Sequence, residues 1–316
     1  MLADIPEPLP GEHVHSILAR FHVLEGKGDF RKTINELLPK DRELNNKFLW
    51  RASFEYIWQR YQGILGREPL LQEHTSFKFD AKFITTELVT AISDSSFIDN
   101  IAYSGSKNLN TNRVWRWCPE CVHENTARYG MRFWHVVHQI PSIVSCPNHN
   151  LMLNYGCTNC HFSQQNLKNF ELPQRNNKCP LCQQPMQYIE AGINEEREWL
   201  QSLTLKLFHS KATSRLCLIK TALKQALGLP DSEFELSREQ RAKIKPYKKE
   251  MIHSVFHGEY QYYFDFGSAS GDRVATPYSI NLIHLMYRDP LYPPLCYLAA
   301  LRLFYSQTFI EQLLLD

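Results

Sequence analysis

The chain has 316 residues, of which 43% are hydrophobic, and its formal net charge at pH 7 is +2. This length and composition predict a globular protein with two or three modest cores, and not a largely disordered chain. No run approaches eighteen uninterrupted apolar residues, so the sequence does not indicate a membrane span. Because a charge of +2 does not by itself indicate a nucleic-acid partner, any basic surface must be local.

The N-terminal part predicts a helical domain over residues 1–105. Apolar residues recur at helical spacing over residues 14–21, and Gly26 ends the pattern. Asp29 is placed to cap a second short helix, and a third is expected over residues 48–61. Three short helices joined by tight turns resemble a helix-turn-helix, in which a later helix enters the DNA major groove. An ordinary helical bundle used for protein contacts fits the same pattern.

An apolar connector is expected over residues 71–77, followed by a further helix over residues 83–92. His74 stands alone in the connector, so we interpret it as a hydrogen-bonded packing residue and not as a ligand. Residues 93–112 are rich in Ser, Asn and Gly and predict a linker.

The central region, residues 106–190, holds seven of the nine cysteines in four close pairs, one of which is completed by a histidine. In each pair two residues separate the two ligands, a spacing that lets one tight turn direct both side chains at a single metal ion. The pairs are Cys118 and Cys121, Cys146 and His149, Cys157 and Cys160, and Cys179 and Cys182.

Four ligand pairs predict two tetrahedral Zn²⁺ sites per chain, with the first two pairs forming one site and the last two the other; crossed pairing is the alternative. Each set supplies four protein ligands, so the zinc ions are expected to be structural, because a catalytic zinc keeps a position for water. Disulfides are disfavoured by the odd number of cysteines and by the lack of an export signal, which together predict a reducing cytoplasm. The two remaining cysteines, Cys217 and Cys296, are expected to be buried apolar thiols.

Aromatic and basic residues alternate around the first two ligand pairs. The aromatic residues are expected to pack around the metal turns as a small core. These are Trp115, Trp117, Phe133 and Trp134. The basic residues are candidates for contacts with nucleic-acid phosphates. These are Arg113, Arg116, Arg128 and Arg132.

The C-terminal part, residues 191–316, predicts a second helical domain, which makes the protein mainly α. Amphipathic helices are expected over residues 195–210 and 216–227. A basic run follows, which is either a solvated helix face or a phosphate-binding surface. Its nucleic-acid candidates are Lys243, Lys245, Lys248 and Lys249. Residues 260–266 fit a strand or a buried loop, and the apolar residues 295–315 predict a helix or helix pair that either closes the core or binds a partner.

Several of these segments resemble the TniQ/TnsD family of transposon target-selection proteins. The likeness is carried by residues 116–121, by Arg128-Tyr129-Gly130 with Phe133-Trp134, and by Cys146-Pro147-Asn148-His149. It extends upstream through Pro10-Gly11-Glu12-His13 to Arg20 and through Glu73-His74-Thr75, and more weakly downstream to residues 292–298. The second cysteine set, Cys157 to Cys182, is present in some members and degenerate in others.

The resemblance implies a target-site selection adaptor in DNA transposition, and not an enzyme. Such an adaptor links target DNA, bound directly or through an RNA-guided Cascade complex, to an AAA+ ATPase that licenses the transposase. It also implies a homodimer in the bacterial cytoplasm, associated with the nucleoid. The alternatives are a direct, TnsD-like DNA-binding selector of which this chain is a truncated form, and a zinc-ribbon transcription factor. A zinc-dependent hydrolase is disfavoured, because no positioned carboxylate pair or base accompanies the cysteines.

Overall fold

The structure is a computed structural model of the 316-residue chain. It describes residues 5–26, 28–38, 52–94, 114–164, 167, 172–186, 194–256, 263, 281–288 and 292–316. Within these residues the protein is mainly α-helical, as predicted, and extended pairing is confined to isolated antiparallel bridges. No helix in these residues is long and apolar enough to cross a membrane.

The described chain groups into two compact units. The first contains residues 1–77, 92–101 and 111–193, and the second contains residues 78–91, 102–110 and 194–316. The first unit therefore joins the N-terminal helices to the cysteine-rich region. The predicted division into three domains, at 105/106 and 190/191, stays a prediction, because compactness does not test whether a segment folds independently.

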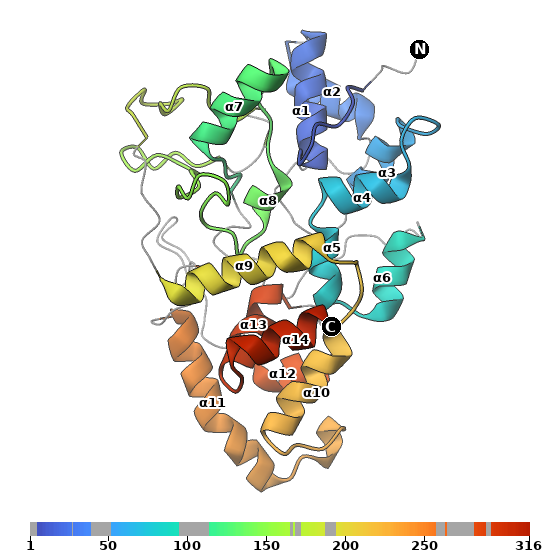
Figure 1. The fold of residues 1–316 in the computed structure, drawn as a ribbon, viewed down its shortest axis with the longest axis vertical. Coiled ribbons are helices and arrows are strands. Elements are labelled where there is room, and N and C mark those ends of the chain that lie inside the picture. The colour runs from blue at the N-terminus through green and yellow to red at the C-terminus, as the bar shows by residue number, and fades with distance from the viewer. Residues whose placement is uncertain are drawn as a thin grey trace. The chain divides into compact units, whose positions relative to one another are not determined.

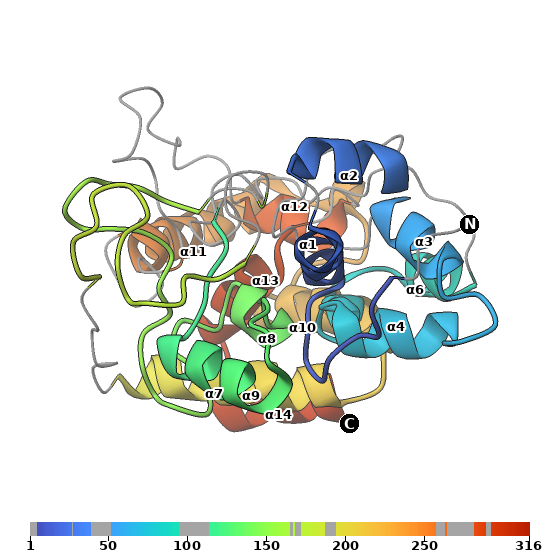
Figure 2. The same ribbon diagram turned by 90° about the horizontal axis from the view of Figure 1, so that it is seen from above.

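The N-terminal helices begin and end where their capping residues predict. Helix α1 covers Val14–Glu25 and ends at Gly26, whose φ of 63° is in the left-handed region that glycine adopts without strain. Helix α2, Phe30–Leu37, is capped by Asp29, whose side chain accepts a hydrogen bond from the Arg31 amide. Figure 2 shows α1 nearly end-on with α2 beside it. Both expected helices are confirmed.

The chain after the third predicted helix departs from expectation. Helix α3 covers Ala52–Gln59, and the first residues of the predicted helix, 48–51, lie outside the described residues. The expected connector is instead helical: α4 covers Arg67–His74 and α5 covers Phe77–Asp80. Pro69 lies in the first turn of α4, where proline is tolerated because the N–H groups there have no intrahelical partner.

The helix expected over residues 83–92 is shorter than predicted. It is preceded by the 3-10 turn η1, Ala81–Phe83, and α6 covers Thr86–Ser93. The predicted linker lies almost wholly outside the described residues. Within the cysteine-rich region α7 covers Pro119–Tyr129 and α8 covers Val136–Gln139.

The second unit is organised around α13, Pro294–Arg302, which is buried over most of its length. Helices α10, α11, α12 and α14 belong to the same unit; the first three cover Leu216–Ala226, Arg238–Phe256 and Leu282–Tyr287. Helices α10, α11 and α14 contact α13, and α9, Glu195–His209, lies against α14, Gln307–Leu315 (Figure 1). The short 3-10 turn η4, Glu233–Glu235, connects α10 to α11.

The apolar C-terminal segment is therefore a helix pair that closes a core, which was one of its two predicted roles. Leu298, Ala300 and Leu301 are buried, and the inward residues of α14 are Ile310 and Leu314. We expected this segment to bind a partner because it would otherwise present an unpartnered apolar stripe. No such stripe is formed, because α14 packs against α9 and α13. Most of the predicted strand or loop at 260–266 lies outside the described residues.

The two isolated cysteines differ from each other. Cys296 is buried on α13, as predicted, and burial raises the pKa of its thiol. Cys217 is exposed, so the prediction of a buried thiol was wrong. The buried face of α10 is set by Leu216, Ile219 and Leu223, and Cys217, one residue after Leu216, points away from it.

Candidate metal centres and nucleic-acid contacts

Three of the four ligand pairs lie in turns that share one backbone geometry. In each turn the amide of the first ligand donates a hydrogen bond to the carbonyl five residues later. An antiparallel bridge joins the residue before the first ligand to the residue that lies six positions after that ligand. These hydrogen bonds run from the Cys146 amide to the Leu151 carbonyl at 2.7 Å, from Cys157 to Phe162 at 2.7 Å and from Cys179 to Gln184 at 2.9 Å. The bridges are Ser145–Met152, Gly156–Ser163 and Lys178–Pro185.

The residue after the second ligand is left-handed in all three turns. Asn150, His161 and Gln183 have φ values of 51°, 57° and 59°, and they are the non-glycine residues with positive φ in the described chain. This conformation costs an L-residue about 1 kcal/mol, so its repetition at one position marks a turn that ligand geometry requires. We name these three turns the knuckles.

Gly156 precedes the first ligand of the second knuckle and has no room for a side chain. A Cβ atom at this position would collide with the carbonyl oxygen of Phe162, which accepts a hydrogen bond from the Cys157 amide. The glycine is therefore needed for the close approach of the two arms of the knuckle.

The remaining pair, Cys118 and Cys121, is presented by a helix. Cys118 is the N-cap of α7, Pro119 is its first residue, and Cys121 lies in the first turn. Pro119 costs no hydrogen bond here, and the free amides and positive end of the helix dipole favour thiolates at this position. The first ligand set thus joins a helix to a knuckle, and the second joins two knuckles.

Within the first set the ligand atoms are spaced as a tetrahedral metal site requires. The Sγ atom of Cys121 lies 3.5 Å from Sγ of Cys146 and 3.4 Å from Nδ1 of His149, and Cys118 Sγ is 3.5 Å from the same nitrogen. All four ligand atoms lie within 4.8 Å of one another. A Zn–S bond of about 2.3 Å implies S–S edges of about 3.8 Å, whereas a disulfide would bring sulfurs to about 2.0 Å.

The second set has similar spacing but is less protected from solvent. Cys157 Sγ is 3.6 Å from Cys182 Sγ, and Cys160 Sγ is 3.5 Å from Cys179 Sγ. Cys157 and Cys179 are buried, whereas Cys160 and Cys182 are half-buried. The structure gathers both sets in chain order and not in crossed pairs. These four-cysteine and three-cysteine-one-histidine sets fit Zn²⁺.

Glu124, which was not among the residues predicted from the sequence, orients the histidine of the first set. The Nε2 atom of His149 lies 3.1 Å from Glu124 Oε1 on α7. Since Nε2–H donates to this carboxylate, Nδ1 keeps its lone pair toward the sulfur atoms, which is the usual arrangement around a metal-bound histidine. Glu124 lies three residues after Cys121 and hence on the same helix face, a spacing that could have pointed to it.

Two further histidines lie near the first set. Burial lowers the pKa of His135 to about 3 and that of His138 to about 4, so both are neutral at pH 7. The Nε2 atom of His138 is 4.0 Å from Cys121 Sγ, and His135 pairs with Asn125 at 2.8 Å. Neither completes a ligand set, because each set already has four members.

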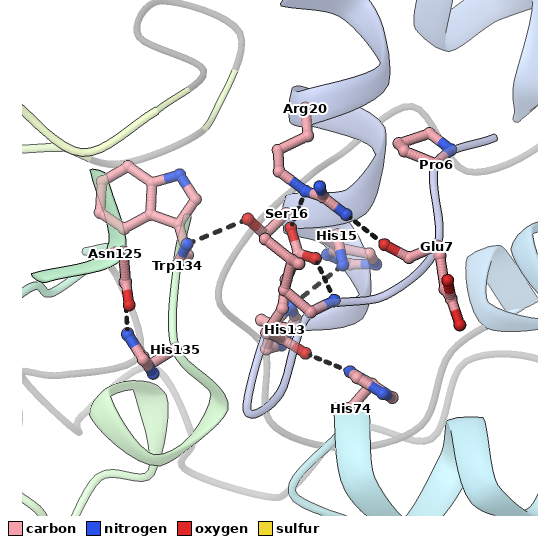
Figure 3. A network of polar contacts seen from close by, with 12 residues as sticks. Pro6, Glu7, His13, His15, Ser16, Arg20, His74, Asn125, Trp134 and His135 are labelled. Atoms are coloured by element: carbon pink, nitrogen blue, oxygen red, sulfur yellow. Dashed lines mark hydrogen bonds and ion pairs between the residues drawn. The ribbon is translucent and has the colours of Figure 1, made fainter. Parts of the chain in front are cut away.

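A buried polar network ties the start of the chain to the metal region (Figure 3). The His13 amide donates to the Trp134 carbonyl at 2.7 Å, the Trp134 amide donates to Ser16 Oγ at 3.0 Å, and the Val136 amide donates to the Gly11 carbonyl at 2.9 Å. These contacts join residues more than a hundred positions apart. Residues 10–20, which carry part of the family resemblance, therefore form an internal joint.

Glu12 and Arg20 form a buried ion pair within this joint. Arg20 Nε lies 2.9 Å from Glu12 Oε1, and their side chains are 6% and 0% exposed. Burial raises the pKa of the Glu12 carboxyl, and the Arg20 guanidinium opposes that shift. The Glu12 carbonyl accepts a hydrogen bond from His74 Nδ1 at 2.7 Å, which confirms that His74 is a hydrogen-bonded packing residue.

The aromatic residues around the metal turns form a core, as predicted. Trp115, Trp117, Phe133 and Trp134 are all buried. The ring of Trp134 contacts that of Trp115 at 5.4 Å and that of Trp117 at 5.7 Å between centroids.

The structure separates the four arginine candidates for nucleic-acid contact. Arg113 lies outside the described residues. Arg116 is 2% exposed, and its guanidinium donates to the carbonyls of Ile140 and Ile143, which places it in the interior. Arg128 is exposed, and Arg132 is half-buried. Burial, and then the nearby positive charge of Arg175, lowers the pKa of Arg132.

The lysine candidates lie on different faces of α11. Ile244 and Met251 are buried, and Tyr247 contacts Phe304 at 4.8 Å between ring centroids. Lys243 shares an outer face with Glu239 and Glu250, and Lys248 is half-buried. The remaining basic residues recur every three or four positions along one exposed face, which we name the basic stripe. It consists of Arg238, Arg241, Lys245 and Lys249.

Comparison with known proteins finds sequence similarity to proteins of DNA transposition. Residues 5–153, a little under half of the chain, match the TniQ family. Transposon Tn7 transposition protein TnsD of Escherichia coli is 25% identical over 162 residues, which cover 48% of this chain and 31% of that protein. The matched region is thus under a third of the relative's own length. The family match includes the first ligand set and ends before the second.

Proposed function

We propose that the chain is a member of the TniQ/TnsD family and that it selects the target site in DNA transposition, because residues 5–153 match the TniQ family. In this proposal it is an adaptor that links target DNA, bound directly or through an RNA-guided Cascade complex, to an AAA+ transposition ATPase. The observation that carries the proposal is the family match over residues 5–153, because it contains both the buried N-terminal joint and the first ligand set.

The two ligand sets would hold zinc as a structural ion. The first would be bound by Cys118, Cys121, Cys146 and His149, and the second by Cys157, Cys160, Cys179 and Cys182. Zinc bound in this way would stabilise turns that bury little apolar surface of their own. Four protein ligands leave no position for a reacting water, which favours a non-catalytic role for the protein.

The first unit fits the role of a rigid frame. The residues that join α1 to the metal region are buried and hydrogen-bonded to one another, so their function is to hold geometry. Recognition would then use exposed surfaces outside this joint. The proposed homodimer is supported by the family resemblance alone. The C-terminal segment that was expected to mediate self-association instead closes a core.

The basic stripe on α11 is the proposed DNA contact. It places basic residues on one face at intervals of about one helical turn, while the acidic residues Glu239 and Glu250 lie on another face. Such a surface suits phosphates and carries no base specificity. Direct binding is therefore expected to be modest and steeply dependent on salt.

Titrations with duplex DNA at several salt concentrations test this contact. Replacing Lys245 and Lys249 by alanine should weaken binding and lower the slope of log K against log salt by about 0.9 for each lost phosphate contact. Lys243→Ala, on the same helix but another face, is the matched control and should leave the slope unchanged. Equal slopes in all variants would remove α11 from the proposal. Site-selective binding that persists at high salt would instead favour a direct, TnsD-like selector.

Binding experiments with purified components test the adaptor role. The full chain, loaded with zinc, is mixed with the AAA+ ATPase and with the RNA-guided effector complex of the same transposon, with and without target DNA. The proposal expects stable capture of the ATPase together with a target complex, and light scattering then gives the number of chains. A chain that captures neither partner under any of these conditions would contradict the adaptor role.

A further inference from the structure

Two basic residues of the second unit lie next to each other without an acidic partner. Lys82, in η1, is 2% exposed, and Arg215, the residue before α10, is half-buried. Among the described residues no carboxylate pairs with either of them, and the Nε atom of Arg215 is buried without a hydrogen-bond partner. A buried cation ordinarily has a counter-charge, because burial without one is costly. The pair therefore has room in its electrostatics for a negatively charged ligand.

The backbone holds the two cations together. The Arg215 amide donates a hydrogen bond to the Lys82 carbonyl at 3.0 Å, and the Ser214 hydroxyl donates one to the Ile84 carbonyl at 2.5 Å. The link between α9 and α10 is thus fixed against η1, which follows α5 (Figure 1). Burial, and then the positive charge of Arg215, lowers the pKa of Lys82 to about 8. Both influences act against the charged ammonium, and a bound anion would oppose them.

Hydrogen-bond donors gather where this pair meets the start of α10. Lys82 Nζ donates to Thr213 Oγ1 at 3.1 Å, so the hydroxyl proton of Thr213, which is exposed, is available to a ligand. The first-turn amides of α10, at Cys217 and Leu218, have no intrahelical acceptor, and this turn contains no acidic residue. Lys82, Thr213, Arg215 and these two amides are named the donor cluster.

The donor cluster presents positive charge and N–H and O–H groups, which is the chemistry that an oxyanion requires. Two cations and the positive end of a helix dipole match the charge of a phosphate group. A guanidinium can donate two parallel hydrogen bonds to phosphate oxygens, and an ammonium adds a point charge. Each phosphate oxygen accepts more than one hydrogen bond, so the remaining hydroxyl and amide donors can be satisfied by the same group.

We propose that the donor cluster binds a phosphate group at the start of α10. The site shares no residue with the basic stripe on α11 or with the two ligand sets, and it does not depend on the proposed function. Because Thr213 is exposed, the site is open to solvent. An open site can receive a phosphate of a nucleic-acid backbone as well as a free phosphate, and the chemistry of recognition is the same for both.

The first test measures the binding of inorganic phosphate to the zinc-loaded full chain by calorimetry at constant ionic strength. Lys82→Met retains a long unbranched side chain but removes the charge, and it should weaken phosphate binding by about tenfold or more. Arg215→Met should have a similar effect, and Thr213→Val, which removes only a neutral hydroxyl, should have a smaller one. Lys243→Met removes an exposed charge from α11 and is the matched control, which should bind phosphate as the unmodified chain does.

Thermal melting separates a binding role of Lys82 from a packing role. Without phosphate, Lys82→Met should melt no lower than the unmodified chain, because an apolar group of similar length replaces an unpaired buried charge. Phosphate stabilises proteins in general, so it should raise both melting temperatures. The rise should be larger for the unmodified chain, which also binds it as a ligand. A variant that melts lower without phosphate and gains as much from phosphate as the unmodified chain would assign Lys82 to packing and overturn the site.

Titrations with duplex DNA identify the source of the phosphate. If it belongs to DNA, Lys82→Met and Arg215→Met should each weaken DNA binding and lower the slope of log K against log salt by about 0.9. Loss of inorganic phosphate binding with unchanged DNA binding would support the site with a free phosphate, or a small phosphorylated molecule, as its ligand. Cationic-residue variants that bind both inorganic phosphate and DNA as the unmodified chain does would overturn the proposal.

Discussion

Replacing Arg20 by methionine should destabilise the first unit strongly, because it leaves the Glu12 carboxylate buried without its counter-charge. The two side chains are 6% and 0% exposed, so water cannot replace the guanidinium. Breaking such a buried pair from one side costs about 3–5 kcal/mol of unfolding free energy. The variant also loses the hydrogen bond from Arg20 to the Glu7 carbonyl, 2.5 Å in the structure.

The double variant Glu12→Gln, Arg20→Met separates the charge effect from the packing effect. A glutamine still accepts the Leu9 amide, which lies 3.0 Å from Glu12 Oε2, but it carries no charge. The double variant should therefore recover a large part of the stability lost by Arg20→Met. The assay is denaturant unfolding of the zinc-loaded protein followed by tryptophan fluorescence.

The pH dependence of Arg20→Met gives an independent check. Burial raises the pKa of Glu12, and removal of Arg20 raises it further, so the folded protein holds the proton more tightly than the unfolded chain does. The loss of unfolding free energy in Arg20→Met, relative to the unmodified chain, should be smallest below the unfolded-state pKa of Glu12, about 4.5, and should grow as the pH rises toward neutrality.

A surface ion pair provides the control for this experiment. Lys206 pairs with Glu311 at 2.7 Å but is exposed, so Lys206→Met should cost less than about 1 kcal/mol. An Arg20→Met variant within about 1 kcal/mol of the unmodified chain, or a double variant no more stable than the single one, would refute the reasoning.

Three further predictions follow from single contacts. Glu124→Ala should lower the zinc affinity of the first set by about 10–100-fold in a chelator competition, whereas Glu120→Ala, on the same helix, should not; equal affinities would exclude the proposed orienting role. Gly156→Ala should loosen the second knuckle and speed metal release from the second set only, and unchanged release would show that the carbonyl facing it moves at no cost. Burial lowers the pKa of His13 well below 6.5, so the unfolded chain gains a proton first and stability falls as the pH drops below 6.5, by up to about 1.4 kcal/mol per pH unit. His13→Asn, which retains an N-cap acceptor, should reduce that slope in unfolding titrations between about pH 5.5 and 7, and an unchanged slope would contradict it.

Local signals were sufficient where the structure depends on local chemistry. The end of α1 at Gly26 and the start of α2 at Asp29 follow from capping, which involves residues only a few positions apart. The two ligand sets follow from the two-residue spacing within each pair. Their assembly in chain order could be predicted because each turn leads directly to the next.

Contacts between distant segments had no such signal. The hydrogen bonds from Gly11 and His13 to residues 134–136 join segments that share no sequence pattern, so the joint between them could not be predicted. Glu124 was missed for a related reason, since its importance depends on a histidine presented by another turn. Burial of α13 on most sides likewise depends on α10, α11 and α14, which the sequence of α13 does not specify.

The basic run shows how helix geometry refines a composition signal. The sequence indicated a cluster of lysines, but α11 distributes them over several faces. Lys245 and Lys249 lie on the basic stripe with Arg238 and Arg241. Lys243 lies on another face, beside acidic residues. The proposed DNA contact is consequently narrower than the run itself.

Mapping of insertion sites tests the central proposal most directly. Transposition is run in cells that carry the complete transposon, with this chain intact, deleted, or restored from a plasmid, and the insertions are sequenced. Target selection by this chain predicts that insertions concentrate at a defined site with the intact or restored chain, and that this concentration is lost on deletion. The same insertion pattern and frequency in the presence and absence of the chain would contradict the account.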